Sequence, residues 1–239
     1  MGIFAVGLFA SYFMEEFNMT FTDQLHEQAA TLWQQSFDHP FIQQISAGTL
    51  PKAVFRFYLL QDRYYLSEFG KLHEQVASQV TNPKGRTFLL EGAQGLKDGE
   101  IAVRKGFFET LQISKQEIAQ TPVAPTAYNY VNHMYAELYR GTPGRAIAGL
   151  LPCYWLYNEI GKRLIAAGSP DALYQQWIET YDSDGYTDSV QKMIALTNET
   201  AARTDADERT AMAASFVRSS AYELAFWQMA MDRQSWQAG

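Results

Sequence analysis

The single cysteine of the chain, Cys153, lies in an aromatic-rich segment that a proline and a glycine interrupt. Pro152 has no amide hydrogen and clashes with the carbonyl four residues earlier, so it predicts a helix kink that frees the carbonyl of Ala148. Gly149, one turn before the cysteine, predicts open space beside the sulfur, and Tyr157, one turn after it, predicts a ring on the same face. Such a site could hold a flat molecule against a nucleophile. The alternative is that Cys153 is a small buried hydrophobic residue.

Two carboxylates stand among apolar and aromatic neighbours. Asp62 shares a predicted helix face with Tyr65, three residues later, and burying an acid is costly unless it binds something. The alternative is an exposed acid or a partner in a tertiary salt bridge. Glu223 lies in the last predicted helix with Phe226 three residues later, a position where burial would raise its pKa and suit it to acid–base chemistry. The alternative there is a carboxylate at the rim of a site.

Other kinds of site have little support in the sequence. A tyrosine-rich stretch that includes Tyr130 begins a predicted helix, and its simpler interpretation is a packing face. None of the four histidines has a glutamate three residues before it, as a ferritin-like di-iron bundle requires, and one cysteine cannot build a thiolate zinc cluster. Glycine-rich phosphate loops and nucleophile elbows are missing from the sequence. A haem site needs only one histidine and stays open as an alternative.

The elements that must position these side chains are helical almost throughout. The first predicted helix has a cap at Thr22 or Asp23, and a long second helix has Pro51 in its first turn, after a loop at residues 38–40 and a turn at residues 47–49. Repeats, hairpin signals and alternating β-branched runs are lacking in the sequence. The predicted fold class is therefore all-α, a globular helical bundle. The second helix is expected to end near residue 83, and further helices are predicted at residues 84–111, 125–140, 143–167, 170–180, 184–203 and 206–233.

Composition narrows the classes of partner. The chain has 239 residues, of which 47% are hydrophobic and 19% charged, values typical of a folded soluble domain. Its net charge of −7, with a pI near 5.1, disfavours nucleic acid and anionic membranes as partners, because both select a basic face. One cysteine cannot form an internal disulfide, which fits a reducing cytosol. We therefore expect a cytoplasmic protein that binds neither nucleic acid nor membrane.

The first residues carry a separate expectation. Residues 1–13 form an uncharged apolar run that is too short to span a bilayer and lacks the features of a signal peptide. The codons for the Met-Glu-Glu sequence at residues 14–16 can contain a purine-rich ribosome-binding sequence just before a second start codon, at Met19. We expect residues 1–18 to be a non-structural leader from a misassigned start, and residues 19–239 to form a single helical domain. The intact mass of the protein expressed from its native gene tests this.

Taken together, the candidate segments resemble the TenA, or thiaminase II, family, over essentially the whole chain from Met19 to about Trp236. The resemblance implies a helical bundle similar to haem oxygenase, a homotetramer, and a site that uses no metal and no cofactor. It places the chain in the branch of the family that contains the cysteine. The matching segments are His39-Pro40-Phe41, Leu60-Gln61-Asp62, Tyr64-Tyr65-Leu66, Pro125-Thr126-Ala127-Tyr128, Leu150 to Tyr157, Ser219-Ser220, Tyr222-Glu223 and Phe226-Trp227.

The activity that this resemblance implies is hydrolysis at the methylene carbon of an aminopyrimidine. The substrate is 4-amino-5-aminomethyl-2-methylpyrimidine or thiamin, and the 5-hydroxymethyl product feeds thiamin salvage. By resemblance Cys153 is the nucleophile, Glu223 the general acid/base, and Asp62 the carboxylate that recognises the ring amino group and a ring nitrogen. The pocket aromatics implied by the resemblance are Tyr65, Tyr130, Tyr157, Tyr181 and Phe226.

Thiolate addition to the ring breaks its aromaticity and turns one difficult displacement into two easier steps, and the ring nitrogen then needs a proton from a buried acid. No cationic residue adjoins Cys153 in the sequence, so what favours its thiolate is open. The choice between thiamin and the aminomethylpyrimidine is open too. Two other functions remain as alternatives: a non-catalytic pyrimidine-binding or regulatory protein, and a haem or oxygen enzyme on the same fold.

Overall fold

The computed structural model describes residues 19–236, apart from the side chains of residues 99–104, and the expected leader at residues 1–18 lies outside this range. Every regular element in the described range is a helix, as predicted. The helices are α2 (Phe21–Phe37), α3 (Pro40–Ala47), α4 (Lys52–Gln79), α5 (Pro83–Thr110), α6 (Lys115–Gln120), α7 (Pro125–Ala136), the π-helix η1 (Glu137–Gly141), α8 (Pro143–Leu164), α9 (Ala172–Asp182), α10 (Asp184–Ala201) and α11 (Ala206–Asp232).

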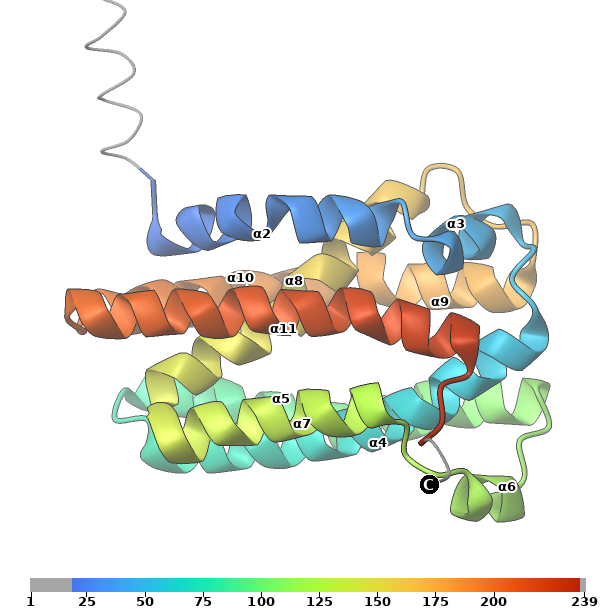
Figure 1. Ribbon diagram of the computed structural model, residues 1–239, viewed down its shortest axis with the longest axis horizontal. Coiled ribbons are helices and arrows are strands. Elements are labelled where there is room, and N and C mark those ends of the chain that lie inside the picture. Colours follow the sequence, from blue (N-terminus) through green and yellow to red (C-terminus); the bar gives the residue numbers. More distant parts are fainter. Residues whose placement is uncertain (1–18, 237–239) are drawn as a thin grey trace, which may run out of the picture.

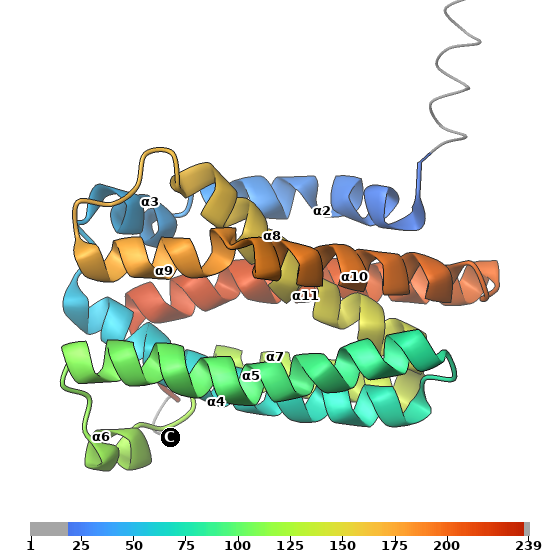
Figure 2. The ribbon, with the colours of Figure 1, turned by 180° about the vertical axis from the view of Figure 1, so that it is seen from behind.

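The helices form two layers, and α8 runs obliquely between α10 and α11 of the second (Figures 1 and 2). Helices α4, α5 and α7 lie side by side in one layer, and α2, α10 and α11 lie in the other (Figures 1 and 2). Helix α8 packs against α11, α10 and α9, and α4 packs against α5. The central helix therefore carries Cys153 into the middle of the bundle, where residues of both layers can reach it.

The cap of the first helix differs from the prediction. Thr20, not Thr22 or Asp23, caps α2: its side chain accepts from the amide of Asp23, whose carboxylate accepts from the amide of Thr20. Thr22 is buried instead, and its amide and hydroxyl both bond the side chain of Asn198 on α10. The Thr22 hydroxyl, which the sequence pattern assigned to capping, thus accepts a hydrogen bond from Asn198 of another helix instead.

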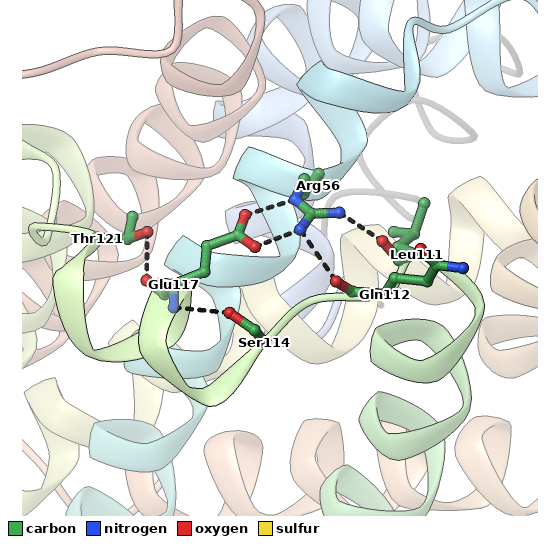
Figure 3. A network of polar contacts seen from close by, with 6 residues as sticks. All are labelled: Arg56, Leu111, Gln112, Ser114, Glu117 and Thr121. Carbon is green, nitrogen blue, oxygen red and sulfur yellow. Dashed lines mark hydrogen bonds and ion pairs between the residues drawn. The ribbon is translucent and has the colours of Figure 1, made fainter.

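Two short helices were not predicted, and one expected position is shifted by a residue. Helix α3 starts straight after the predicted loop because the ring of His39 accepts from the amide of Phe41. Pro51 is the residue before α4 rather than a member of its first turn. Helix α6 is tied to α4 by Arg56, whose guanidinium donates to both carboxylate oxygens of Glu117 and to two carbonyls at the end of α5 (Figure 3).

Helix α8 continues through Pro152 to Leu164, and its glycine has a different use from the predicted one. A Cβ at Gly149 would lie 2.7 Å from the hydroxyl oxygen of Ser215 on α11. The Ser215 hydroxyl donates to the carbonyl of Arg145 on α8, at 2.9 Å. The prediction that Gly149 leaves open space beside the sulfur was therefore wrong, because α11 fills that space.

Among the helices at residues 19–236, none combines the length and the apolar character that crossing a membrane requires.

Candidate active site

A cavity of about 280 Å³ opens among α4, α5, α8, α9 and α10, and the cysteine lies in its wall. Four of the predicted site residues line it: Asp62 from α4, Cys153 and Tyr157 from α8, and Tyr181 from α9. On α4, Leu59, Asp62 and Leu66 are spaced at three and four residues, so one stripe of that helix faces the cavity. The other lining residues are Gly92, Gly95, Leu96, Phe107, Tyr154, Trp177, Thr180 and Tyr186.

A second group of predicted residues packs around Cys153 without lining the cavity. Glu223, on α11, is 2% exposed and accepts a hydrogen bond from the Tyr130 hydroxyl, at 2.7 Å. The Tyr65 ring lies 4.9 Å from the Tyr130 ring and 5.8 Å from the Phe226 ring, between ring centroids. The fold thus brings together all eight residues predicted for the site, in two groups that meet at the cysteine.

The carboxyl group of Glu223 holds its proton at neutral pH. Burial raises its pKa to about 8, the hydrogen bond from Tyr130 opposes this rise, and the charge of Asp62 adds to it. A carboxyl group of that pKa is mostly protonated at pH 7 and can act as an acid there. The expectation that burial makes Glu223 a proton donor agrees with this environment.

The thiol of Cys153 is also held in its neutral form. Burial raises its pKa well above the ordinary value, and the charges of Glu223 and Asp62 raise it further. A hydrogen bond from Tyr65 acts in the opposite direction. The Tyr65 hydroxyl also lies 3.9 Å from the sulfur of Met134, and its single proton can serve only one sulfur at a time. At rest the site therefore contains a thiol and a carboxylic acid, and not a thiolate.

The position of Tyr181 depends on two residues of α8. The Asn158 amide donates to the carbonyl of Tyr181, at 2.9 Å, and to the hydroxyl of Thr187, at 3.0 Å. A Cβ at Gly161 would lie 2.8 Å from the carbonyl carbon of Tyr181, so only glycine permits this close approach of α9. The Tyr181 ring then lies 4.8 Å from the Tyr157 ring, between centroids, and the two rings form one side of the cavity.

Sequence reasoning missed several of the residues that line or hold the site. Asn158 and Gly161 act through the backbone of Tyr181. The sequence feature that could have identified them is their spacing of three residues, which places them on one face of the helix that carries Cys153. Tyr154 and Tyr186 line the cavity, and the Tyr186 hydroxyl donates to the carbonyl of Cys153, at 3.2 Å. With 14% aromatic residues in the chain, no pattern distinguished these rings from packing residues.

Comparison with known proteins agrees with this fold. The sequence profile of the TENA/THI-4/PQQC family matches residues 26–233. The aminopyrimidine aminohydrolase of Bacillus subtilis (strain 168) is 38% identical over 218 residues, which cover 91% of this chain and 92% of the relative. The enzyme of the same name from Halalkalibacterium halodurans is 29% identical, with 91% and 98% covered.

A solved structure titled as a TenA homologue protein from P. horikoshii OT3 has a TM-score of 0.81 and 27% identity, and the match covers 90% of this chain and 99% of that one. The all-α bundle is thus shared with a solved structure of this kind. The chain belongs to the TENA/THI-4/PQQC family, and the predicted family and fold are confirmed.

Proposed function

We propose that the protein is an aminopyrimidine aminohydrolase that replaces the group on the 5-methylene carbon of a 4-aminopyrimidine with hydroxyl. The observation that carries the proposal is one cavity in which a carboxylate, Asp62, and a thiol, Cys153, share an aromatic wall, with the protonated Glu223 packed beside the thiol. The names of the relatives from Bacillus subtilis and Halalkalibacterium halodurans support the same reaction class.

In this proposal each residue has one task. Asp62 accepts hydrogen bonds from the ring amino group and a protonated ring nitrogen, and the rings of Tyr157 and Tyr181 pack against the pyrimidine. The sulfur of Cys153 adds to a ring carbon while Glu223 gives its proton to a ring nitrogen. The leaving group departs from the methylene with the electron pair of its bond, and an amine leaving group takes the thiol proton and leaves as ammonia. Water then adds its hydroxyl at the methylene and gives its other proton to Glu223. The sulfur leaves and takes the proton of the ring nitrogen as aromaticity returns.

The neutral pair at rest agrees with this order of proton transfers. Burial is the main reason that the pKa of the Cys153 thiol is raised, and the negative charges of Glu223, once it has lost its proton, and of Asp62 would repel a free thiolate as well. The thiolate therefore needs to form only as the ring takes a proton, so that the site never holds three negative charges. This supplies the activation that the sequence left open, since no lysine or arginine lines the cavity within the described residues.

The test is parallel hydrolysis of 4-amino-5-aminomethyl-2-methylpyrimidine and thiamin by the wild-type protein and Cys153→Ala. We expect wild-type turnover that Cys153→Ala loses, with the unfolding temperature and pyrimidine affinity kept. Turnover by Cys153→Ala close to that of the wild type would exclude covalent catalysis by this residue. Binding of the pyrimidine without turnover of either compound by the wild type would replace the enzyme by a pyrimidine-binding protein.

The role of Asp62 has its own measurement. Asp62→Ala leaves polar atoms of the bound ring unpaired, and the loss should be about 1–3 kcal/mol of binding free energy. Titration calorimetry with the 5-hydroxymethyl product measures this directly. An unchanged affinity in Asp62→Ala contradicts the recognition role.

The narrower expectations are part of the same proposal. Salvage of degraded thiamin favours the aminomethylpyrimidine as the physiological substrate, and a higher kcat/KM for it than for thiamin would support this. The single cysteine supports a cytoplasmic location, and the family resemblance supports a homotetramer. Sedimentation equilibrium tests for four copies of the 27.1 kDa chain. A sedimenting mass of one copy contradicts the tetramer.

A further inference from the structure

The cavity extends from Asp62 and Cys153 to α5, where two glycines form part of its wall. Gly92 and Gly95 lie one turn apart in the interior of α5 and both line the cavity. Glycine inside a helix destabilises it relative to alanine, so each position calls for a reason. The structure gives a packing reason for one of them and none for the other.

Gly92 is needed for packing. A Cβ at this position would lie 3.3 Å from the hydroxyl oxygen of Tyr154 and 3.4 Å from the ring of His73. Those two groups form a buried pair: the Tyr154 hydroxyl donates to Nε2 of His73, at 2.7 Å, and Nδ1 of His73 donates to the carbonyl of Phe69, at 2.7 Å. The pair fixes the Tyr154 ring, which follows Cys153 in the chain, as a rigid part of the cavity wall.

Gly95 differs, because nothing described lies within 4 Å of the position where its Cβ would be. Gly95 is exposed, so its missing side chain accommodates no neighbour and leaves the cavity wider where it opens to solvent. Leu66 and Leu96 flank the same stretch of wall, and both are apolar. Asp62 is the only carboxylate among the described lining residues, so no acid lies at this end to hold a small ammonium group.

The substrate has one direction in which its leaving group can extend. Asp62 holds the ring on the side of α4, Tyr157 and Tyr181 pack against it from α8 and α9, and Glu223 lies beside the sulfur on α11. Open cavity remains toward α5. A substituent on the methylene carbon, displaced next to Cys153, therefore meets the wall that Gly95 leaves open.

We propose that Gly95, with Leu66 and Leu96, forms the leaving-group subsite and sets the size of the group that the enzyme can displace. The subsite suits apolar or heteroaromatic leaving groups larger than ammonia, since its wall is apolar and wide. This inference rests on the proposed function and assigns its leaving-group specificity to a residue. A larger side chain at position 95 should exclude bulky leaving groups while the smallest substrate still fits.

The experiment uses Gly95→Ala and Gly95→Leu, with Gly185→Leu as the matched control. Gly185 also has nothing within 4 Å of its Cβ position, but it lies near the start of α10 and does not line the cavity. Hydrolysis of 4-amino-5-aminomethyl-2-methylpyrimidine and of thiamin is measured for each variant as kcat/KM. The kcat/KM ratio of thiamin to the aminomethylpyrimidine should fall at least about tenfold in Gly95→Leu, by less in Gly95→Ala, and not in Gly185→Leu.

Binding measurements separate the two proposals. Affinity for thiamin and for the 5-hydroxymethyl product is measured by calorimetry in the same variants, and Gly95→Leu should weaken thiamin alone. Wild-type turnover with a ratio that Gly95→Leu leaves unchanged, or an equal loss for both substrates in a folded protein, overturns the subsite and leaves the proposed function standing. Wild-type protein that neither hydrolyses nor binds these compounds overturns the proposed function, and the subsite with it.

Discussion

The hydrogen bond between Tyr130 and Glu223 gives the sharpest test of how this site holds its proton. The Tyr130 hydroxyl donates to Glu223 at 2.7 Å, and both side chains are buried. This bond favours the charged carboxylate and so opposes the effect of burial, which raises the pKa of Glu223 to about 8. Tyr130→Phe removes the donor and keeps the ring, which stacks on the Tyr222 ring with centroids 5.1 Å apart.

The size of the effect follows from the strength of such a bond. A hydrogen bond to a charged group is worth about 1.5–3 kcal/mol, and about 1.4 kcal/mol corresponds to a change of one in pKa. Without the Tyr130 hydroxyl, the pKa of Glu223 should therefore rise further, from about 8 to roughly 9–10. The direction is firm because only the ionised carboxylate loses a partner that it needs.

The assay is the pH profile of kcat/KM for the aminomethylpyrimidine, which reports ionisations of the free enzyme. If Glu223 acts as an acid, activity falls as the pH rises through its pKa, near 8 in the wild type. In Tyr130→Phe this alkaline limb should move to higher pH. Tyr128→Phe is the matched control, because Tyr128 lies on the same helix but is 46% exposed.

A second observable keeps the result from depending on kinetics alone. The carbonyl stretch of a protonated carboxyl group, followed by infrared difference spectroscopy against Glu223→Gln, should persist to higher pH in Tyr130→Phe than in the wild type. An alkaline limb that stays in place, or moves to lower pH, would refute the reasoning. So would a limb that moves equally in Tyr128→Phe.

Three further predictions concern stability. Because the pKa of Glu223 rises on folding from 4.5 to about 8, the folded state loses stability as the pH rises through that range. Glu223→Gln should therefore be inactive, yet its free energy of unfolding at pH 9 should exceed that of the wild type by up to roughly 5 kcal/mol, which gives it a higher unfolding temperature at pH 9 but not at pH 4. Burial lowers the pKa of His73 from 6.5 to about 4, so between these pH values the unfolded chain binds a proton that the folded protein does not. The free energy of unfolding should therefore fall by roughly 3 kcal/mol from pH 7 to pH 4. His73→Gln can still accept a hydrogen bond from Tyr154, and it should remove that part of the pH dependence in urea unfolding. Gly149→Ala forces a methyl group against the Ser215 hydroxyl, 2.7 Å from the Cβ position, and should cost about 1–3 kcal/mol in urea unfolding.

Each of these has a contrary outcome. Equal unfolding temperatures of Glu223→Gln and the wild type at pH 9 would mean that burying the ionised Glu223 does not destabilise the folded protein. If the free energy of unfolding of His73→Gln depends on pH as in the wild type, groups other than His73 cause the acid sensitivity. His26→Gln, at a more exposed site, is the control for this variant. Gly149→Ala with wild-type stability would mean that α8 and α11 do not pack as closely as this contact requires.

Helix type and approximate extent follow from local sequence, because the 3.6-residue spacing of apolar side chains and the breaks at proline and glycine act within a few residues. The predicted segments at residues 84–111 and 206–233 agree with α5 and α11 to within about a residue. The cap of α2 was predicted at the wrong residue because Asn198, far away in the chain, bonds Thr22. A partner 176 residues away leaves no trace in a local pattern.

The candidate site divides in the same way. The sequence by itself identified the reactive side chains, because a lone thiol and two acids among aromatic residues are informative by type and spacing, and the family resemblance added their roles. Only the tertiary structure decided that Asp62 faces the cavity while Glu223 lies beside the Cys153 thiol and accepts a hydrogen bond from Tyr130. It also decided that burial keeps the Cys153 thiol and the Glu223 carboxyl group neutral. Burial and charge proximity are sums over side chains from α4, α7, α8 and α11, so they exist only once those helices have packed. Gly95 and Gly149 are both glycines within helices, and the local sequence does not tell them apart. In the folded protein nothing lies within 4 Å of the Cβ position of Gly95, whereas the Ser215 hydroxyl from another helix lies against that of Gly149.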